Sequence, residues 1–168
     1  MAVTNIVLAG LGGQGVVTAS DLLSTAAFST GLQVKKSEVH GMSQRGGSVT
    51  SDVRFGEEVL SPMVPDGEAD FLLVFEPSQV EINRHWLRPG GMLITPEDIP
   101  EGSLRNRKSL NVALLGALSV QLAFDEATWM EAIRTRLPEK IHAINEQAFA
   151  IGREAGERLG RETQTEGV

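Results

Sequence analysis

Glycines at a fixed spacing are the first candidate for chemistry in this sequence. Gly10, Gly12 and Gly15 form a Gly-x-Gly-x-x-Gly pattern directly after the apolar run 5–9. Glycines at this spacing permit a tight turn and let backbone N–H groups approach a phosphate, and a following helix adds its positive N-terminal end. The position between a predicted strand and a predicted helix favours a phosphate-binding turn. A tight turn that binds no ligand is the alternative.

The residues after the second predicted strand indicate which nucleotide would suit this turn. An acidic residue about 20 residues after the glycines is typical of an NAD ribose site. Lys35 and Lys36 occupy that region here, followed by Ser37 and Glu38. Because lysines favour a phosphorylated ribose, coenzyme A or NADP fits this pattern better than NAD if a nucleotide binds.

A polar, glycine-rich segment over 37–48 is the second candidate. It combines His40 and Arg45 with hydroxyl groups and flexible backbone. Such a loop can surround an anion or dock onto a partner surface. The alternative is a surface loop in which Arg45 pairs with an acidic side chain and the glycines only form turns. His40 has no adjacent serine or cysteine nucleophile, so acyl transfer by this chain is not indicated.

Isolated charged residues give weaker signals. Glu76 ends the apolar run 71–75, where α/β sheets place ligand contacts. An acid in the first turn of the next helix explains Glu76 as well, and we favour that interpretation. Arg105, Arg107 and Lys108 form a small basic cluster, which we interpret as surface or as part of an interface.

Apolar runs and helical spacing alternate around these residues. Runs over 5–9, 71–75 and 92–94 predict buried strands, and a shorter run over 32–34 follows a helix that ends at Gly31. The first strand, the glycine turn, the helix and the second strand together predict a βαβ unit.

Two other segments complete the predicted architecture. Apolar and polar residues alternate over 48–55, which predicts a half-exposed strand, with antiparallel pairing as one option. Apolar positions recur at helical spacing between 112 and 159, so the last third is predicted to be helical. These patterns predict an α/β fold: a Rossmann-like, mostly parallel sheet with helices on both faces and a helical C-terminal third.

Length and composition limit the classes of function. The 168 residues predict a single domain over 1–160, and the polar stretch 161–168 is expected to be a frayed tail. A formal net charge of −7 disfavours nucleic-acid binding. No run approaches the ~20 apolar residues of a membrane span, and no secretory signal is visible, so we expect a cytoplasmic location.

The lack of cysteine limits the chemistry further. It excludes disulfides, thiolate nucleophiles and any iron–sulfur cluster held by this chain. The three histidines lie far apart in the sequence, so no metal site is predicted.

The run 35–49, together with Gly10–Gly15, carries a resemblance to a known family. It is similar to the gamma subunit or domain of the 2-oxoacid:ferredoxin oxidoreductases, and within that family to the small (beta) subunits of indolepyruvate ferredoxin oxidoreductases. The similarity covers most of residues 4–160. Further matching positions are Ser61-Pro62, the segment 69–77, Gly90-Gly91, Asn111 with 114–116, and Asn145 with Ala148, Phe149 and Gly152.

The resemblance implies a subunit of a larger enzyme. Such enzymes decarboxylate a 2-oxo acid oxidatively to an acyl-CoA and pass the electrons to ferredoxin, and an arylpyruvate such as indolepyruvate is the implied substrate. Thiamine diphosphate, magnesium and iron–sulfur clusters are expected on a large partner subunit. The present chain is expected to bind none of them, to contribute no catalytic residue and to be inactive alone.

The implied task of this chain is to complete the partner's active site and to help hold coenzyme A. Nucleic acid and membranes are not expected partners. The residues expected to face the coenzyme are Gly10, Gly12, Gly13, Gln14, Gly15, Ser43, Gln44, Arg45 and Gly46.

Two other functions remain open from the sequence. The chain could be a stand-alone protein that binds a nucleotide or coenzyme A. It could also be an assembly subunit whose glycine turn holds no ligand.

Overall fold

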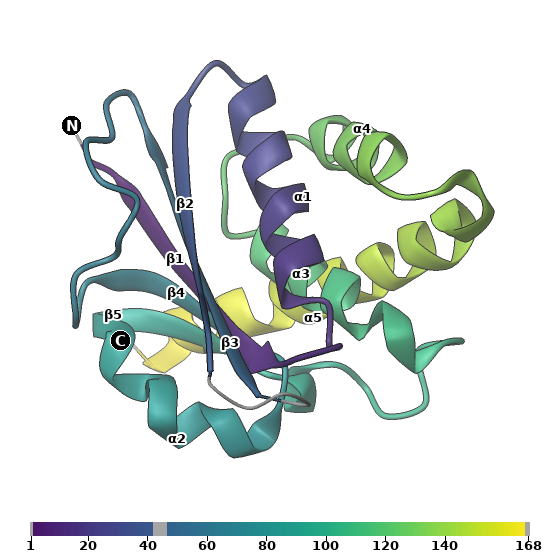
Figure 1. The fold of residues 1–168 in the computed structure, drawn as a ribbon. Coiled ribbons are helices and arrows are strands. Elements are labelled where there is room, and N and C mark those ends of the chain that lie inside the picture. The colour runs from purple at the N-terminus through teal and green to yellow at the C-terminus, as the bar shows by residue number, and fades with distance from the viewer. Residues whose placement is uncertain (1, 42–46, 167–168) are drawn as a thin grey trace.

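A five-stranded sheet in the order β2-β3-β1-β4-β5 lies at the centre of the computed structural model (Figure 1). The structure describes residues 2–41 and 47–166. The strands are β1 (Thr4–Leu11), β2 (Gln33–His40), β3 (Ser48–Gly56), β4 (Ala69–Val74) and β5 (Leu87–Ile94). The helices are α1 (Val16–Ser29), α2 (Val80–Asn83), α3 (Leu110–Ser119), α4 (Glu126–Arg136) and α5 (His142–Glu166). Short 3₁₀ helices cover Pro77–Gln79, Arg84–Trp86, Pro96–Asp98, Arg107–Ser109 and Glu139–Ile141.

The sheet is mixed. β1 pairs with β4, and β4 with β5, in parallel, whereas β3 pairs antiparallel with both β1 and β2. The expectation of a mostly parallel sheet is therefore wrong in its proportion, although the α/β class and the helical C-terminal third are confirmed. The cause is the short connection between His40 and Ser48, because strands joined by a short loop pair antiparallel. β3 thereby lies between β2 and β1, inside the predicted βαβ unit.

The alternating segment 48–55 forms most of β3, and its antiparallel pairing confirms that option. Its half-exposed character is also confirmed, since one face of the strand is buried and the other is exposed at Ser48 and half-buried at Thr50 and Arg54. Asp52 is the exception on the second face, where the segment that contains Val64 lies against it. The Asp52 carboxylate accepts the Val64 N–H at 2.9 Å, and burial raises the pKa of Asp52.

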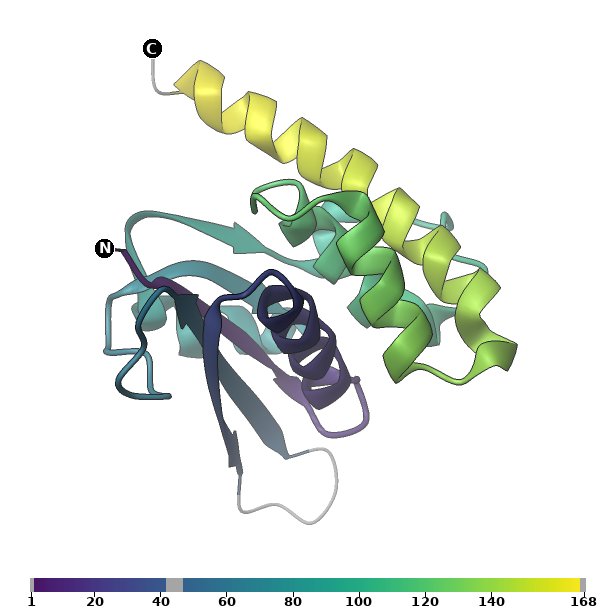
Figure 2. The ribbon, with the colours of Figure 1, turned by 90° about the horizontal axis from the view of Figure 1, so that it is seen from above.

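The two faces of the sheet are covered unequally. Ile6 and Leu8 of β1 face a large core that also contains residues of α1, α3, α4 and α5. Val7 and Ala9 face the opposite way, into a smaller core bounded by Val80 of α2 and by the following 3₁₀ turn. Figure 2 shows the four longer helices together on one side of the sheet. Helices on both faces are thus confirmed, with one thick layer and one thin one.

α3 and α5 pack against each other through glycines. A Cβ atom added at Gly116, Gly152 or Gly156 would overlap backbone atoms of the facing helix. The absence of side chains at these three positions lets the two helices approach closely. This packing matters for function because α3 is thereby held in position above the turn between β1 and α1.

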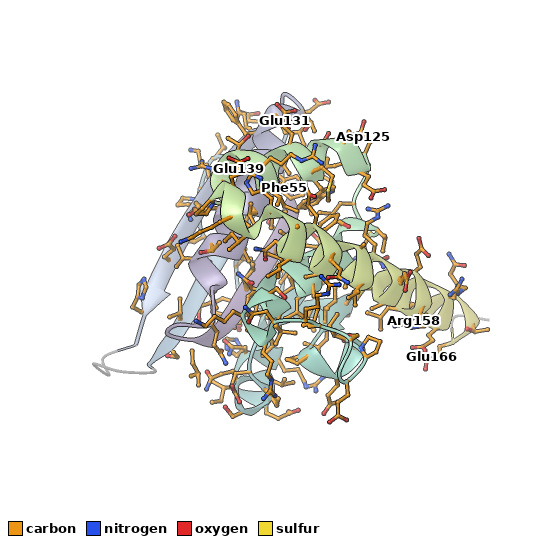
Figure 3. The ribbon with its side chains drawn as sticks, turned by 90° about the vertical axis from the view of Figure 1, so that its right-hand side faces the viewer. Phe55, Asp125, Glu131, Glu139, Arg158 and Glu166 are labelled. Atoms are coloured by element: carbon orange, nitrogen blue, oxygen red, sulfur yellow. The ribbon has the colours of Figure 1, made fainter. Side chains whose placement is uncertain are left out.

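The last residues of the chain extend α5. Figure 3 looks onto α4 and α5, with Asp125 at the start of α4 and with Arg158 and Glu166 on the C-terminal part of α5. The segment expected to fray is therefore helical as far as Glu166, with exposed side chains over 161–166. Arginine and glutamate are good helix formers, so the helix continues past its last apolar contact. Within the described residues, no helix has the length and apolar character needed to cross a membrane.

Two glycines of α5 provide a matched test of the close packing between α3 and α5. We predict that Gly152→Ala lowers the free energy of unfolding by more than about 2 kcal/mol, because its Cβ would overlap the Ala113 carbonyl. Gly160→Ala, whose Cβ would lie 3.6 Å from its nearest described neighbour, should instead stabilise by about 0.5–1 kcal/mol. Urea denaturation of both variants measures the difference, and equal effects would contradict the close packing.

Candidate functional site

The glycine pattern forms the turn between β1 and α1. Gly15 is the N-cap of α1 with φ 79° and ψ 27°, and Gly13 has φ 86°. These left-handed conformations are readily adopted by glycine and rarely by other residues. Because no described side chain caps α1 and its first turn has no acidic residue, the first N–H groups of the helix remain available to a ligand.

The side chain of Gln14 folds back over this turn. Its Oε1 accepts the Leu11 N–H at 2.7 Å, and its Nε2 donates to Glu76 Oε2 at 2.7 Å. A Cβ at Gly10 would lie 2.9 Å from the same Oε1, so the first glycine of the pattern leaves room for Gln14. The favoured interpretation of Glu76 as an acid in a helix first turn is therefore wrong. Glu76 precedes the 3₁₀ helix, and its carboxylate contacts the glycine turn instead.

α3 contacts the same turn through Asn111. This residue is only 7% exposed, and its Nδ2 donates to the Gly15 carbonyl at 3.2 Å. A Cβ at Gly15 would overlap the Asn111 amide. The close approach of α3 therefore requires glycine at position 15 in addition to the left-handed backbone.

The flanks of the second predicted motif lie beside the first. The Gly12 N–H donates to the Gly47 carbonyl at 2.8 Å, and the Gly41 N–H donates to the Ser48 carbonyl at 2.6 Å. The structure thus brings the end of the β2–β3 connection to the glycine turn. The predicted residues Ser43, Gln44, Arg45 and Gly46 lie outside the described residues.

An open cavity of about 820 Å³ lies over the turn. An adjoining cavity of about 690 Å³ shares Pro96, Arg107 and Leu110 with it and continues over Ile99, Pro100 and Leu104. The two cavities adjoin as one open trough whose lining mixes polar and apolar groups along its length. The residues that line the first cavity are Gly13, Gln14, Gly15, Thr18, Phe75, Glu76, Pro77, Pro96, Arg107, Lys108, Leu110 and Asn111.

Two cations were missed as site residues by the sequence interpretation. Arg107 and Lys108 are exposed, line the cavity and form no side-chain hydrogen bond or ion pair with the described residues. They immediately precede α3, where the helix dipole disfavours cations. A basic pair before an apolar helix that has no acid in its first turn is the sequence signal that could have identified them.

The positive ends of two helices point toward this region. Neither α1 nor α3 has an acidic residue in its first turn, whereas α4 is capped by Asp125 and has Glu126 in its first turn. Together with Arg107 and Lys108, these ends favour an anion in the cavity. The lining thus supplies groups suited to binding: backbone N–H groups, two cations and side-chain amides.

One wall of the cavity is fixed by a capping box. Asp98 Oδ2 accepts the Thr95 N–H at 2.8 Å, and Thr95 Oγ1 accepts the Glu97 N–H at 3.3 Å. Burial raises the pKa of Asp98, and the neighbouring Glu162 and Glu97 raise it further. These bonds hold Pro96 at the junction of the two cavities.

The fold and cavity define an α/β protein with a glycine turn at the end of β1, beside an open cavity lined by two cations. The family model described as pyruvate ferredoxin/flavodoxin oxidoreductase matches residues 5–155. The chain belongs to this family, which confirms the resemblance noted from the sequence.

Curated relatives agree with this family. The chain is 36% identical to the indolepyruvate oxidoreductase subunit IorB of Thermococcus kodakarensis, over 92% of this chain and 96% of the relative. It is 31% identical to the pyruvate/ketoisovalerate oxidoreductases common subunit gamma of Pyrococcus abyssi, over 67% of this chain and 64% of the relative.

Solved structures share the fold. The gamma subunit of keto/oxoacid ferredoxin oxidoreductase from Geobacter sulfurreducens superposes with a TM-score of 0.75 at 25% identity, over 92% of this chain and 99% of that one. The 2-oxoglutarate:ferredoxin oxidoreductase of Magnetococcus marinus, solved with 2-oxoglutarate, coenzyme A and succinyl-CoA bound, gives 0.79 at 23% identity over 94% of this chain. The present chain spans about a third, 32%, of that Magnetococcus chain.

Variants at the two left-handed glycines distinguish the stability cost of backbone strain from the cost of contact with α3. We predict that Gly13→Ala costs about 1–2 kcal/mol of stability, from backbone strain alone, because no described atom lies within 4 Å of its Cβ position. Gly15→Ala should cost more, since its Cβ would also overlap the Asn111 amide. In an Asn111→Ala background the Gly15→Ala cost should fall to that of Gly13→Ala, as measured by thermal unfolding. An unchanged cost in that background would show that Asn111 does not restrict position 15.

Proposed function

We propose that this chain is the small subunit of an indolepyruvate-type 2-oxoacid:ferredoxin oxidoreductase, and that it completes the active site and binds coenzyme A. Its full-length similarity to IorB subunits supports the enzyme class and the arylpyruvate substrate. The coenzyme A and succinyl-CoA bound in the Magnetococcus enzyme support coenzyme A as the acyl acceptor. The single observation that carries the coenzyme A assignment is the trough over the glycine turn.

The chemistry of the trough suits coenzyme A. The coenzyme carries a diphosphate and a 3′-phosphate near one end, together with an adenine ring. The phosphates match the first N–H groups of α1, Arg107 and Lys108, because charge-assisted hydrogen bonds to phosphate are strong. The adjoining cavity is lined by Ile99, Pro100 and Leu104, apolar groups that suit the flat face of a base, and also by Glu97 and Glu101.

The redox cofactors belong to the partner in this proposal. The chain has no cysteine, so its residues cannot supply the thiolates that hold an iron–sulfur cluster. Thiamine diphosphate, magnesium and the clusters are accordingly assigned to a large partner subunit, and ferredoxin is reached through the complex. Thiamine diphosphate supplies the carbanion chemistry of decarboxylation when it is bound there.

This chain contributes binding and orientation. The glycine turn and the two cations hold the phosphate end of the coenzyme, which leaves its thiol arm free to reach the partner. Fixing one reactant in this way lowers the entropic part of the barrier to acyl transfer. The Gly12 N–H donates to the Gly47 carbonyl, so the described end of the β2–β3 connection lies beside the glycine turn. The predicted Ser43, Gln44, Arg45 and Gly46 come directly before Gly47 in the sequence. We therefore retain those four residues as part of the proposed coenzyme site.

The test uses the complex reconstituted from this chain and its large subunit, with methyl viologen as the electron acceptor. We predict that the double variant Arg107→Ala/Lys108→Ala raises the KM for coenzyme A about tenfold or more, which corresponds to about 1.4 kcal/mol. The KM for the 2-oxo acid should stay unchanged. Lys140→Ala, which removes another exposed cation, from the 3₁₀ helix before α5, serves as the control.

Three results would contradict the proposal. An unchanged KM for coenzyme A in the double variant would show that Arg107 and Lys108 do not bind the coenzyme. Full activity of the large subunit alone would show that this chain is not a required subunit of the enzyme. Tight coenzyme A binding by the isolated chain, without any effect on the reconstituted enzyme, would favour a stand-alone binding protein.

A further inference from the structure

Glu76 stands out because its charge is wrong for the site it lines. Its carboxylate lies in the same cavity as Arg107, Lys108 and the start of α1, where the surrounding groups favour an anion. A carboxylate there opposes the binding of phosphate. A direct contact between Glu76 and the phosphates is therefore disfavoured, and its position needs another cause.

That cause is visible in its bond to Gln14. Glu76 Oε2 accepts the Gln14 Nε2 at 2.7 Å, which leaves Gln14 Oε1 to accept the Leu11 N–H at 2.7 Å. A carboxylate can only accept hydrogen bonds, so it selects the orientation of the amide in which nitrogen faces Glu76. The oxygen is thereby fixed toward the backbone of the turn.

The backbone of Glu76 is itself held beside the turn. The Phe75 N–H donates to the Ala9 carbonyl at 2.8 Å and extends the β1–β4 pairing to the residue before Glu76. Glu76 follows with an extended conformation, φ −134° and ψ 121°. The end of strand β4 thus holds the Glu76 carboxylate beside the turn. Its bond to the Gln14 amide, which in turn accepts the Leu11 N–H, links that carboxylate to residues 11–14.

We propose that Glu76 is a positioning residue that acts through Gln14 to set the shape of the coenzyme-binding turn. This inference rests on the proposed function, since it assigns a role at the same site. Glu76 holds the Gln14 amide, the amide holds the Leu11 N–H, and the turn keeps Gly13 exposed in the lining of the cavity. The repulsion between its charge and the phosphates is outweighed by this ordering of the turn.

The test compares Glu76→Ala, Glu76→Gln and Gln14→Ala in the reconstituted complex with coenzyme A as the varied substrate. We expect Glu76→Ala and Gln14→Ala each to raise the KM for coenzyme A about fivefold to tenfold. The kcat at saturating coenzyme A and the KM for the 2-oxo acid should not change. Glu76→Gln, whose amide oxygen can still accept from Gln14, should restore the KM to within about twofold of the wild-type value.

A double-mutant cycle adds a readout that a merely structural role would not give. If Glu76 acts through Gln14, the variant Glu76→Ala/Gln14→Ala should raise the KM no more than either single variant does. Glu131→Ala removes an exposed carboxylate from α4 and controls for the change in net charge. Gln14→Ala leaves β4 intact and keeps the proposal testable if Glu76→Ala does not fold.

Two outcomes would overturn the inference. A lower KM for coenzyme A in Glu76→Ala would show that the carboxylate only repels the ligand. Additive effects in the double variant would show that Glu76 does not act through Gln14. These outcomes differ from failure of the proposed function, in which the Arg107→Ala/Lys108→Ala variant itself leaves the KM for coenzyme A unchanged.

Discussion

The left-handed backbone at Gly15 is the constraint on which the rest of this molecule depends. It turns the chain from β1 directly into α1, so that the first N–H groups of a 14-residue helix face an open cavity. The same glycine makes room for Asn111, which donates to its carbonyl and brings the start of α3 to the turn. The start of α1 thereby meets the start of α3 and its preceding cations, Arg107 and Lys108, although Gly15 and Asn111 are 96 residues apart in the chain.

Much of the architecture could be predicted because it depends on local signals. The glycine spacing, the apolar run before it and the helical spacing after it correctly predicted β1, the turn and α1. The proportion of parallel pairing could not be predicted in the same way, because a strand's neighbours depend on contacts between distant segments. The short connection 41–47 accounts for the antiparallel pairing of β2 with β3, whereas the insertion of β3 beside β1 depends on a pairing between segments distant in the chain.

The candidate site was only partly accessible from sequence for a related reason. The five turn residues are adjacent in the chain, whereas Glu76, Arg107 and Asn111 reach the turn only through the fold. A basic pair before an apolar helix is the local signal for Arg107, but it does not show which cavity the pair lines until α3 is seen to begin beside the start of α1. Similarity to a family of 2-oxoacid oxidoreductases then supplies the class of chemistry, which a chain without cysteine does not show by itself.

In the proposed enzyme two chains have different tasks, and the smaller chain binds and orients the thiol substrate. Calorimetric titration of coenzyme A into the large subunit alone, and into its complex with this chain, tests that division of tasks most directly. We predict saturable binding to the complex that weakens with increasing salt, and at least tenfold weaker binding to the large subunit alone. Equal affinity in the two titrations would contradict the account.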